Sequence, residues 1–212
     1  MMETAALAYV AAKPISVGVE FEATMSKVQA LTRLDRDSPE MAALNTQARE
    51  LGAKTMFSAT EAAQGQAFLA MAGFSPEHVL QSMPAMLDMA KAGDMDLART
   101  ADIASNVQTA MGLDASQMPR IADTLTMAFT SSNVSLEMLG ETMKYMAPAA
   151  RAAGMSLEEA SAMAGLLGNA GIQASMAGTS LRNVITRLAA PPKAAGEALS
   201  ELRTRPKTRR AT

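Results

Sequence analysis

The chain has no cysteine and no tryptophan, and aromatic residues make up only 3% of its 212 positions. The absence of cysteine excludes disulfides and thiolate metal sites, and it leaves the redox compartment open. Histidine occurs once, as His78, so the commonest general acid–base side chain is nearly missing. What is plentiful is alanine and methionine, with 19 methionines, and 49% of the chain is hydrophobic. Such a composition allows a sizeable core of small and flexible side chains that pack closely.

Charge is distributed unevenly along the chain. Residues 1–192 hold 13 Lys/Arg and 19 Asp/Glu, whereas residues 193–212 hold 6 Lys/Arg and 2 Asp/Glu. The basic excess is therefore confined to a short tail, and the mildly acidic body argues against nucleic-acid binding by the main domain. The run from Arg203 to Arg210 could contact nucleic acid non-specifically, but a disordered tail is the simpler interpretation.

The sequence contains no evident secretory signal, because its apolar start lacks a basic region and a cleavage pattern. Its longest uncharged stretch, residues 160–181, is long enough to span a bilayer. Glycines, Asn169 and Gln173 interrupt that stretch, so we interpret it as a buried turn between helices. A protein that acts on the cell envelope through these residues is kept as one hypothesis.

Helix boundaries of one type recur four times. Each combines a glycine, which ends a helix in a left-handed conformation, with an apolar residue and a Ser or Asp that caps the next helix. The four boundaries are Gly73-Phe74-Ser75, Gly93-Asp94-Met95-Asp96, Gly112-Leu113-Asp114 and Gly154-Met155-Ser156. They predict medium-length helices with tight corners, which argues against a single rod and against a sheet-based enzyme.

Further caps complete the predicted helices. Ser58 with Glu61 and Ser156 with Glu159 have the spacing of capping boxes, and Ser135 opens another helix. We predict an all-α, multi-helix compact domain of short helices with Gly/Ser/Asp-capped corners, flexible termini, roughly nine to eleven helices and no strand. No fixed period is found, so a regular solenoid is not predicted.

Several breakers set the expected limits of these helices. Pro14 and Gly18 are expected to interrupt any helix in residues 1–20, Gly52 to end a helix, and Pro84 to kink or divide another. A final helix is expected from Ala174 to Leu188. The predicted organisation is an N-terminal extension (1–20), a helical core domain (21–192) and a basic, disordered C-terminal tail (193–212).

Candidates for chemistry are few. His78 is best explained as an exposed or half-buried first-turn residue, and Glu158-Glu159 as a cap beside a solvated neighbour. Asp94, Asp96 and Asp102 do not have the spacing of a calcium loop. The glycines of residues 165–171 follow a helix and lack a phosphate-binding lysine, so close helix approach explains them better. We therefore predict no enzyme activity and no catalytic, metal or cofactor-binding residues.

Methionines recur on two predicted helix faces. The core is the ordinary interpretation, and an adaptable face that binds partner helices is the alternative. The two sets are Met83, Met86 and Met89, and Met138, Met143 and Met146.

An ordered set of short blocks resembles the core region of tail tape measure proteins of long-tailed bacteriophages and prophages. The resemblance covers residues 15–192 and rests largely on the same caps and corners. The blocks are FEATMSKV (21–28), ARELGA (48–53), FSATEA (57–62), AGF (72–74), DLA (96–98), ADIAS (101–105), GLDA (112–115), MKY (143–145), GMSLEE (154–159), GIQ (171–173) and AGTSLR (177–182).

The resemblance implies a structural phage tail protein, without catalytic residues, that acts in tail assembly and tail-length determination and takes part in genome delivery. It implies three partners, the tail tube protein, the tail assembly chaperones and the baseplate hub, with self-association as a further option. It also implies a location in the host bacterial cytoplasm during assembly and then in the tail lumen of the virion. Neither specific nucleic-acid binding nor a membrane role is expected.

The chain is shorter than a tape measure protein, whose reach comes from extended helix at about 1.5 Å per residue. Because the resemblance fades after Pro192, we expect a truncated or prophage-derived copy. The competing hypothesis is a stand-alone α-helical adaptor that binds partner helices without controlling length.

Overall fold

The computed structural model describes the backbone of residues 2–204 and the side chains of residues 17–198 and Ser200. Over that range the chain forms ten α-helices, one short 3-10 helix and no strand, which confirms the predicted all-α class. The α-helices are α1 (Met2–Thr32), α2 (Pro39–Lys54), α3 (Ala59–Met71), α4 (Pro76–Ala92), α5 (Leu97–Met111), α6 (Met118–Thr130), α7 (Leu136–Ala152), α8 (Leu157–Asn169), α9 (Ala174–Ala189) and α10 (Lys193–Thr204), and the 3-10 helix η1 spans Ala115–Gln117.

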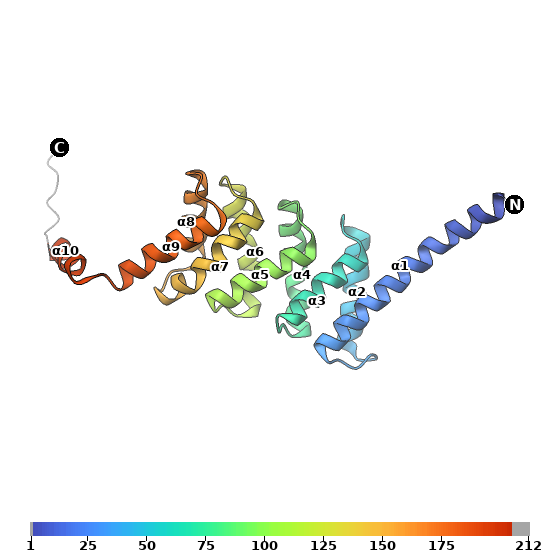
Figure 1. Ribbon diagram of the computed structural model, residues 1–212. Coiled ribbons are helices and arrows are strands. Elements are labelled where there is room, and N and C mark those ends of the chain that lie inside the picture. Colours follow the sequence, from blue (N-terminus) through green and yellow to red (C-terminus); the bar gives the residue numbers. More distant parts are fainter. Residues whose placement is uncertain (1, 205–212) are drawn as a thin grey trace.

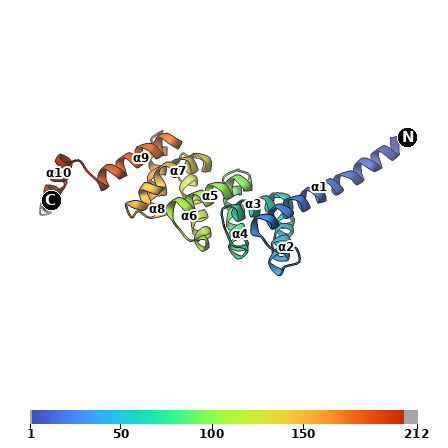
Figure 2. The same ribbon diagram turned by 60° about the horizontal axis from the view of Figure 1, so that its bottom comes forward.

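The helices pack in two rows (Figures 1 and 2). The odd-numbered helices α1 to α9 pack against one another in order, and α2, α4, α6 and α8 do the same in a second row. The N-terminal part of α1 projects from one end of this array, and α10 lies beyond the opposite end (Figure 1). The first helix therefore contacts the third, the third the fifth, and so on along the chain.

We call an odd-numbered helix with the even-numbered helix that follows it a unit. The residues that precede α3, α5, α7 and α9 are Ser58, Asp96, Ser135 and Gln173, so successive units begin 38, 39 and 38 residues apart. The fixed period that was not found in the sequence is therefore present in the structure. The period is hidden in the sequence because the turn inside the unit moves, with Gly73, Gly112 and Gly154 at unit positions 16, 17 and 20.

The predicted N-caps are confirmed, but Gly93 is not left-handed as expected: its φ is −89°, and the next residue, Asp94, has φ 48°. Ser75, Asp96 and Ser135 each accept a hydrogen bond from the backbone N–H three residues later. Ser58 with Glu61 and Ser156 with Glu159 form complete capping boxes. Asp114 caps the short 3-10 helix rather than α6 directly. These local signals fix where each helix begins because they satisfy N–H groups that have no partner inside the helix.

Proline does not divide the helices in which it was expected to do so. Helix α4 continues through Pro84, and the reason lies in another helix. Proline removes the hydrogen bond to the carbonyl four residues earlier. That carbonyl belongs to Leu80, and it accepts a 2.7 Å hydrogen bond from Gln47 Nε2 of α2 instead. The interaction replaces the lost bond and ties the first two units together.

Other boundary predictions are also corrected. Helix α1 runs without interruption through Pro14 and Gly18, and α2 continues past Gly52 to Lys54. The tail expected to be disordered from residue 193 begins with α10, so α9 is not the last helix. The rest of that tail, residues 205–212, lies outside the described residues. Helix α9, Ala174–Ala189, ends one residue beyond its predicted limit.

Close helix approach depends on small residues at the sixth position of the unit. A Cβ on Gly178 of α9 would lie 2.5 Å from the Thr142 carbonyl oxygen of α7, and one on Gly140 of α7 would lie 2.8 Å from Ile103 Cγ2 of α5. Ala63 and Ala101 occupy the same position in the earlier units and are fully buried. The alanine-rich and glycine-rich composition is thus used where neighbouring units touch.

Candidate interaction surface

The residues singled out for chemistry have structural partners. His78 is half-buried in the first turn of α4, and its Nδ1 lies 3.1 Å from the hydroxyl of the cap residue Ser75. Its predicted position is confirmed. Glu159 belongs to the capping box of α8, whereas Glu158 accepts two hydrogen bonds, of 2.7 and 2.8 Å, from Arg120 of α6. The two neighbouring carboxylates therefore serve different contacts rather than one site.

The acidic residues near α5 are similarly separated. Asp96 caps α5 through the N–H of Arg99, and Asp102 pairs with the Arg99 guanidinium. Within the part of the chain whose side chains are described, no group of three or more His, Asp or Glu side chains is arranged to hold a metal ion.

The glycine-rich stretch 165–171 brings α8 close to the turn between α6 and α7. A Cβ on Gly165 would lie 2.9 Å from Ser132 Oγ, and one on Gly168 would lie 2.2 Å from Val134 Cγ1. This confirms close approach as the role of these two glycines. The turn after them was expected to be buried, but Ala170 and Gly171 are exposed, which corrects that detail. The uncharged stretch 160–181 is divided between α8 and α9, and no helix among the described residues is long and apolar enough to cross a membrane.

Five of the six predicted methionines are buried and belong to the shared core. Met138 is the exception, at 38% exposed. The proposed Met-rich binding face is therefore not available as such. The buried set is Met83, Met86, Met89, Met143 and Met146.

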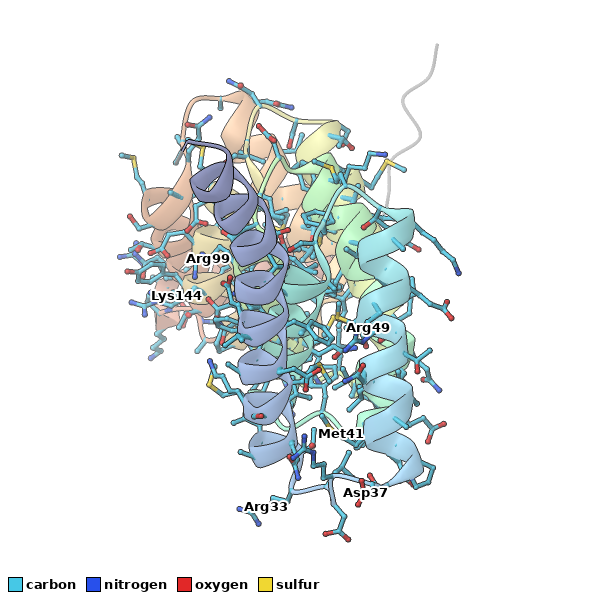
Figure 3. All side chains as sticks on the ribbon, turned by 90° about the vertical axis from the view of Figure 1, so that its right-hand side faces the viewer. Arg33, Asp37, Met41, Arg49, Arg99 and Lys144 are labelled. Carbon is cyan, nitrogen blue, oxygen red and sulfur yellow. The ribbon has the colours of Figure 1, made fainter. Side chains whose placement is uncertain are left out.

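Two grooves lie between consecutive units. In the odd-numbered row, a groove of about 420 Å³ lies between α5 and α7. Arg99, Asp102, Glu141 and Lys144 supply charge of both signs to its lining, and Ile103 supplies apolar surface. Figure 3, which looks along the array from the α1 end, shows Arg99 and Lys144 on the same flank, away from Arg33 and Asp37 at the turn between α1 and α2.

Arg99, which lines this groove, forms an ion pair with Glu137 of α7. Arg99 Nε donates a 3.0 Å hydrogen bond to Glu137 Oε2, and a second guanidinium nitrogen contacts the other carboxylate oxygen. The hydrogen bond to Arg99 lowers the pKa of Glu137, and the same interaction raises the pKa of Arg99. Both groups therefore stay charged across the physiological range, so Arg99 keeps its positive charge in the groove lining.

The even-numbered row carries a second groove, of about 360 Å³, between α6 and α8. Its lining includes Met127, which is 69% exposed, together with Ala128 and Ala162. Sequence reasoning missed this apolar groove because Met127 lies on no predicted methionine face. The signal that could have pointed to this surface is the unit repeat, since unit position 32 is a large apolar residue in both units, Met127 and Leu166.

The family model described as phage-related minor tail protein matches residues 45–208. The chain belongs to this family. It is 42% identical over 192 residues to the tape measure protein of Pneumococcus phage Dp-1, and 37% identical over 190 residues to the probable tape measure protein of Escherichia phage P2.

These alignments cover 91% and 90% of the chain but only 16% and 23% of the two relatives. The probable tape measure protein of Halomonas phage phiHAP-1 is 26% identical over 89% of the chain and 23% of its own length. The chain thus spans a quarter or less of each of these relatives. No solved structure matches it significantly.

Membership in the minor tail protein family relates the chain to phage tail proteins. The family match begins within α2 and extends through α10, so it covers α3 to α10 and leaves out α1. The resemblance recognised from the caps and corners is thereby confirmed.

Proposed function

We propose that this chain acts in tail assembly and tail-length determination as the core region of a tape measure-type protein. The observation that carries the proposal is the family match over residues 45–208, supported by alignment of nine-tenths of the chain with proteins named tape measure proteins. The tail tube protein, the assembly chaperones and the baseplate hub are the proposed partners. The host cytoplasm and then the tail lumen are the proposed locations, with a later part in genome delivery.

The architecture favours docking over length measurement as the contribution of this region. An extended helix advances about 1.5 Å per residue, and length measurement requires such extended helix. Here each unit folds back on itself, so adding a unit adds packed surface far more than reach. We infer that the array contributes mainly docking surface during assembly and adds little to the length that the tape measure-type protein sets.

Gene disruption tests the role. In the phage or prophage that encodes the chain, we expect disruption of this region to remove tails or to broaden their length distribution, as measured by negative-stain electron microscopy. A complementing copy of the undisrupted gene serves as the control. Normal tails with an unchanged length distribution would contradict the proposal and favour the stand-alone adaptor.

A unit deletion separates docking from measurement. Removing residues 96–134 deletes one complete unit, α5 with α6, and leaves the flanking units in the same order. If this region lay in the tail as a continuous helix, the deletion would shorten the tail by about 58 Å. Because the array is folded, we expect any tails that form to shorten by much less, and shortening by the full amount would overturn the docking role.

A further inference from the structure

The C-terminal end of the array exposes apolar residues whose counterparts on α5 and α7 are buried. At unit position 12, Leu69, Val107 and Met146 are at most 3% exposed, whereas Val184 of α9 is 48% exposed. At position 16, Met111 and Ala150 are buried, whereas Leu188 is 64% exposed. The same structural positions therefore change from core to surface at the last odd-numbered helix.

The even-numbered row also ends in exposed residues, although their counterparts on α6 are exposed as well. Leu166 of α8 is 67% exposed, and Ala170 beside it is also exposed. The corresponding residues of α6 are Met127 and Ser131, which line the groove against α8. On α8 this side has no following helix packed on it, because α8 and α10 are not a packed pair. We call Leu166, Ala170, Val184 and Leu188 the open face.

Helix α10 carries the sequence pattern of the helix that would cover this face. Four of its apolar residues fall at unit positions 23, 26, 27 and 30, which is one stripe along a helix. In α6 and α8 the same four positions are all buried. The residues are Met118, Ile121, Ala122 and Leu125 in α6, Leu157, Ala160, Ser161 and Ala164 in α8, and Ala195, Ala198, Leu199 and Leu202 in α10.

Helix α10 nevertheless does not pack along α9, and it lies beyond the end of the array (Figure 1). Ala195 and Ala198 of its stripe are exposed. In the units of α3, α5 and α7, by contrast, the two helices of the unit pack against each other. The chain therefore contains both the open face and a helix with the pattern to cover it, α10, but the two are not packed together.

The connection before α10 explains the separation. The turns inside the earlier units contain a residue with a left-handed backbone, which reverses the chain: Arg33 at φ 57°, Gly73 at 89°, Gly112 at 64° and Gly154 at 75°. Between α9 and α10 stand Ala190, at φ −134°, and then Pro191 and Pro192. Proline fixes φ near about −65° and keeps the residue before it extended. This connection extends the chain instead of reversing it, so α10 is not returned to its own open face.

We propose that the open face receives α10 from a second copy of this chain, and that the exchange is reciprocal. The open face and α10 lie at the same end of the chain, separated only by residues 190–192. A copy that docks α10 on its partner therefore brings its own open face to the partner's α10. Mutual exchange uses both elements and closes a two-fold symmetric dimer, which leaves neither α10 nor the open face uncovered. The repeat continues across this interface as if α10 belonged to the partner's last unit.

The mass of the full 212-residue chain in solution is the first test. Light scattering after gel filtration is expected to give twice the 22.2 kDa chain mass. Leu202→Asp places a charge in the proposed buried stripe, and Leu188→Asp places one in the open face. Each is expected to weaken dimerisation by about 100-fold, because an unpaired charge is costly to bury. Met127→Asp, at an exposed site of the internal groove, is the matched control and should stay dimeric.

Mixing the two variants gives a sharper test. Leu202→Asp keeps an intact open face, and Leu188→Asp keeps an intact α10, so one of the two exchanges can still form. Differently tagged copies are expected to capture each other more strongly than either variant captures itself. Replacing Pro191 and Pro192 with glycine should allow α10 to fold back on its own chain and convert the dimer to a monomer.

Three results would overturn the proposal. A monomeric wild-type chain with exchange-protected α10 amides would place α10 on its own chain, and a monomer with unprotected amides would show that the face stays open. A dimer unaffected by both aspartate variants would place self-association elsewhere. Circular dichroism of each variant distinguishes these outcomes from misfolding. Leu188→Asp is expected to keep its helical fold, because Leu188 is mostly exposed in the single chain. The test does not depend on the proposed tail role.

Discussion

Arg99 and Glu137 lie 38 residues apart and join α5 to α7 through a 3.0 Å hydrogen bond from Nε to Oε2 and a second guanidinium contact. Arg120 and Glu158 are separated by the same 38 residues and join α6 to α8. In both rows the ion pair links the unit of α5 and α6 to the unit of α7 and α8. The separation is one residue shorter than the 39-residue unit that begins at Asp96, so each pair joins nearly equivalent positions of consecutive units.

Removing the Arg99–Glu137 pair should have a small effect on stability. Both side chains are substantially exposed, at 43% and 50%, so solvent screens their attraction. We expect Arg99→Ala to lower the free energy of unfolding by about 0.5 kcal/mol. Urea denaturation of Arg99→Ala, Glu137→Gln and the double variant gives the coupling energy. A loss above about 3 kcal/mol would show a buried pair that the structure does not contain.

The same pair predicts a pH dependence. Hydrogen bonding to Arg99 lowers the pKa of Glu137 below its ordinary value of 4.5. The folded state therefore binds the proton less readily than the unfolded state, so the contribution to stability is present above pH 4.5 and is lost as pH falls through the folded pKa. The stability difference between wild type and Glu137→Gln should shrink over that acidic window. A difference that grows on acidification would contradict the assignment.

Gly178→Ala should be destabilising. The added Cβ would lie 2.5 Å from the Thr142 carbonyl oxygen, and backbone atoms cannot move aside without shifting a helix. We expect a loss of about 1–3 kcal/mol in thermal or urea unfolding. Gly18→Ala is the matched control, because nothing lies within 4 Å of its Cβ position in α1. There the better helix propensity of alanine should leave stability unchanged or raise it by up to about 1 kcal/mol.

Methionine positions can be assigned by a paired comparison. Met143 is fully buried in α7, so Met143→Ala should cost about 2–5 kcal/mol through lost burial and a cavity. Met127 is 69% exposed, so Met127→Ala should change stability by no more than about 0.5 kcal/mol. Differential scanning calorimetry measures both. Equal effects would contradict the division between core and groove methionines.

Loss of a capping box should be detectable in one helix. Ser58 Oγ accepts the Glu61 N–H at 3.2 Å, and Glu61 accepts the Ser58 N–H at 2.7 Å. Ser58→Ala leaves an N–H at the start of α3 without its partner and should cost about 1 kcal/mol. Ser58→Asp keeps an acceptor and should retain most of the stability. Loss of hydrogen-exchange protection confined to the first turn of α3 would identify the cap as the cause.

Local sequence signals predicted most of the helix starts but not the repeat. Ser58, Ser75, Asp96, Ser135 and Ser156 could be recognised because a cap acts within three residues. The repeat could not be recognised from the corners, since the internal turn shifts while the unit length stays constant. The interaction surfaces were predicted least well, because Met127 and Arg99 acquire their roles only from the helix packed beside them.

The sequence by itself determined the all-α class, the helix starts and the family, because these depend on caps, helical spacing and ordered blocks that act over a few residues. Only the tertiary structure decided that Pro84 lies inside a continuous helix, since the carbonyl it leaves unpaired is satisfied by Gln47 from another helix. It also decided that five predicted methionines are core and that Val184 and Leu188 are surface. Burial depends on which helices stack side by side, and that arrangement joins residues about one unit apart, beyond the range of any local pattern.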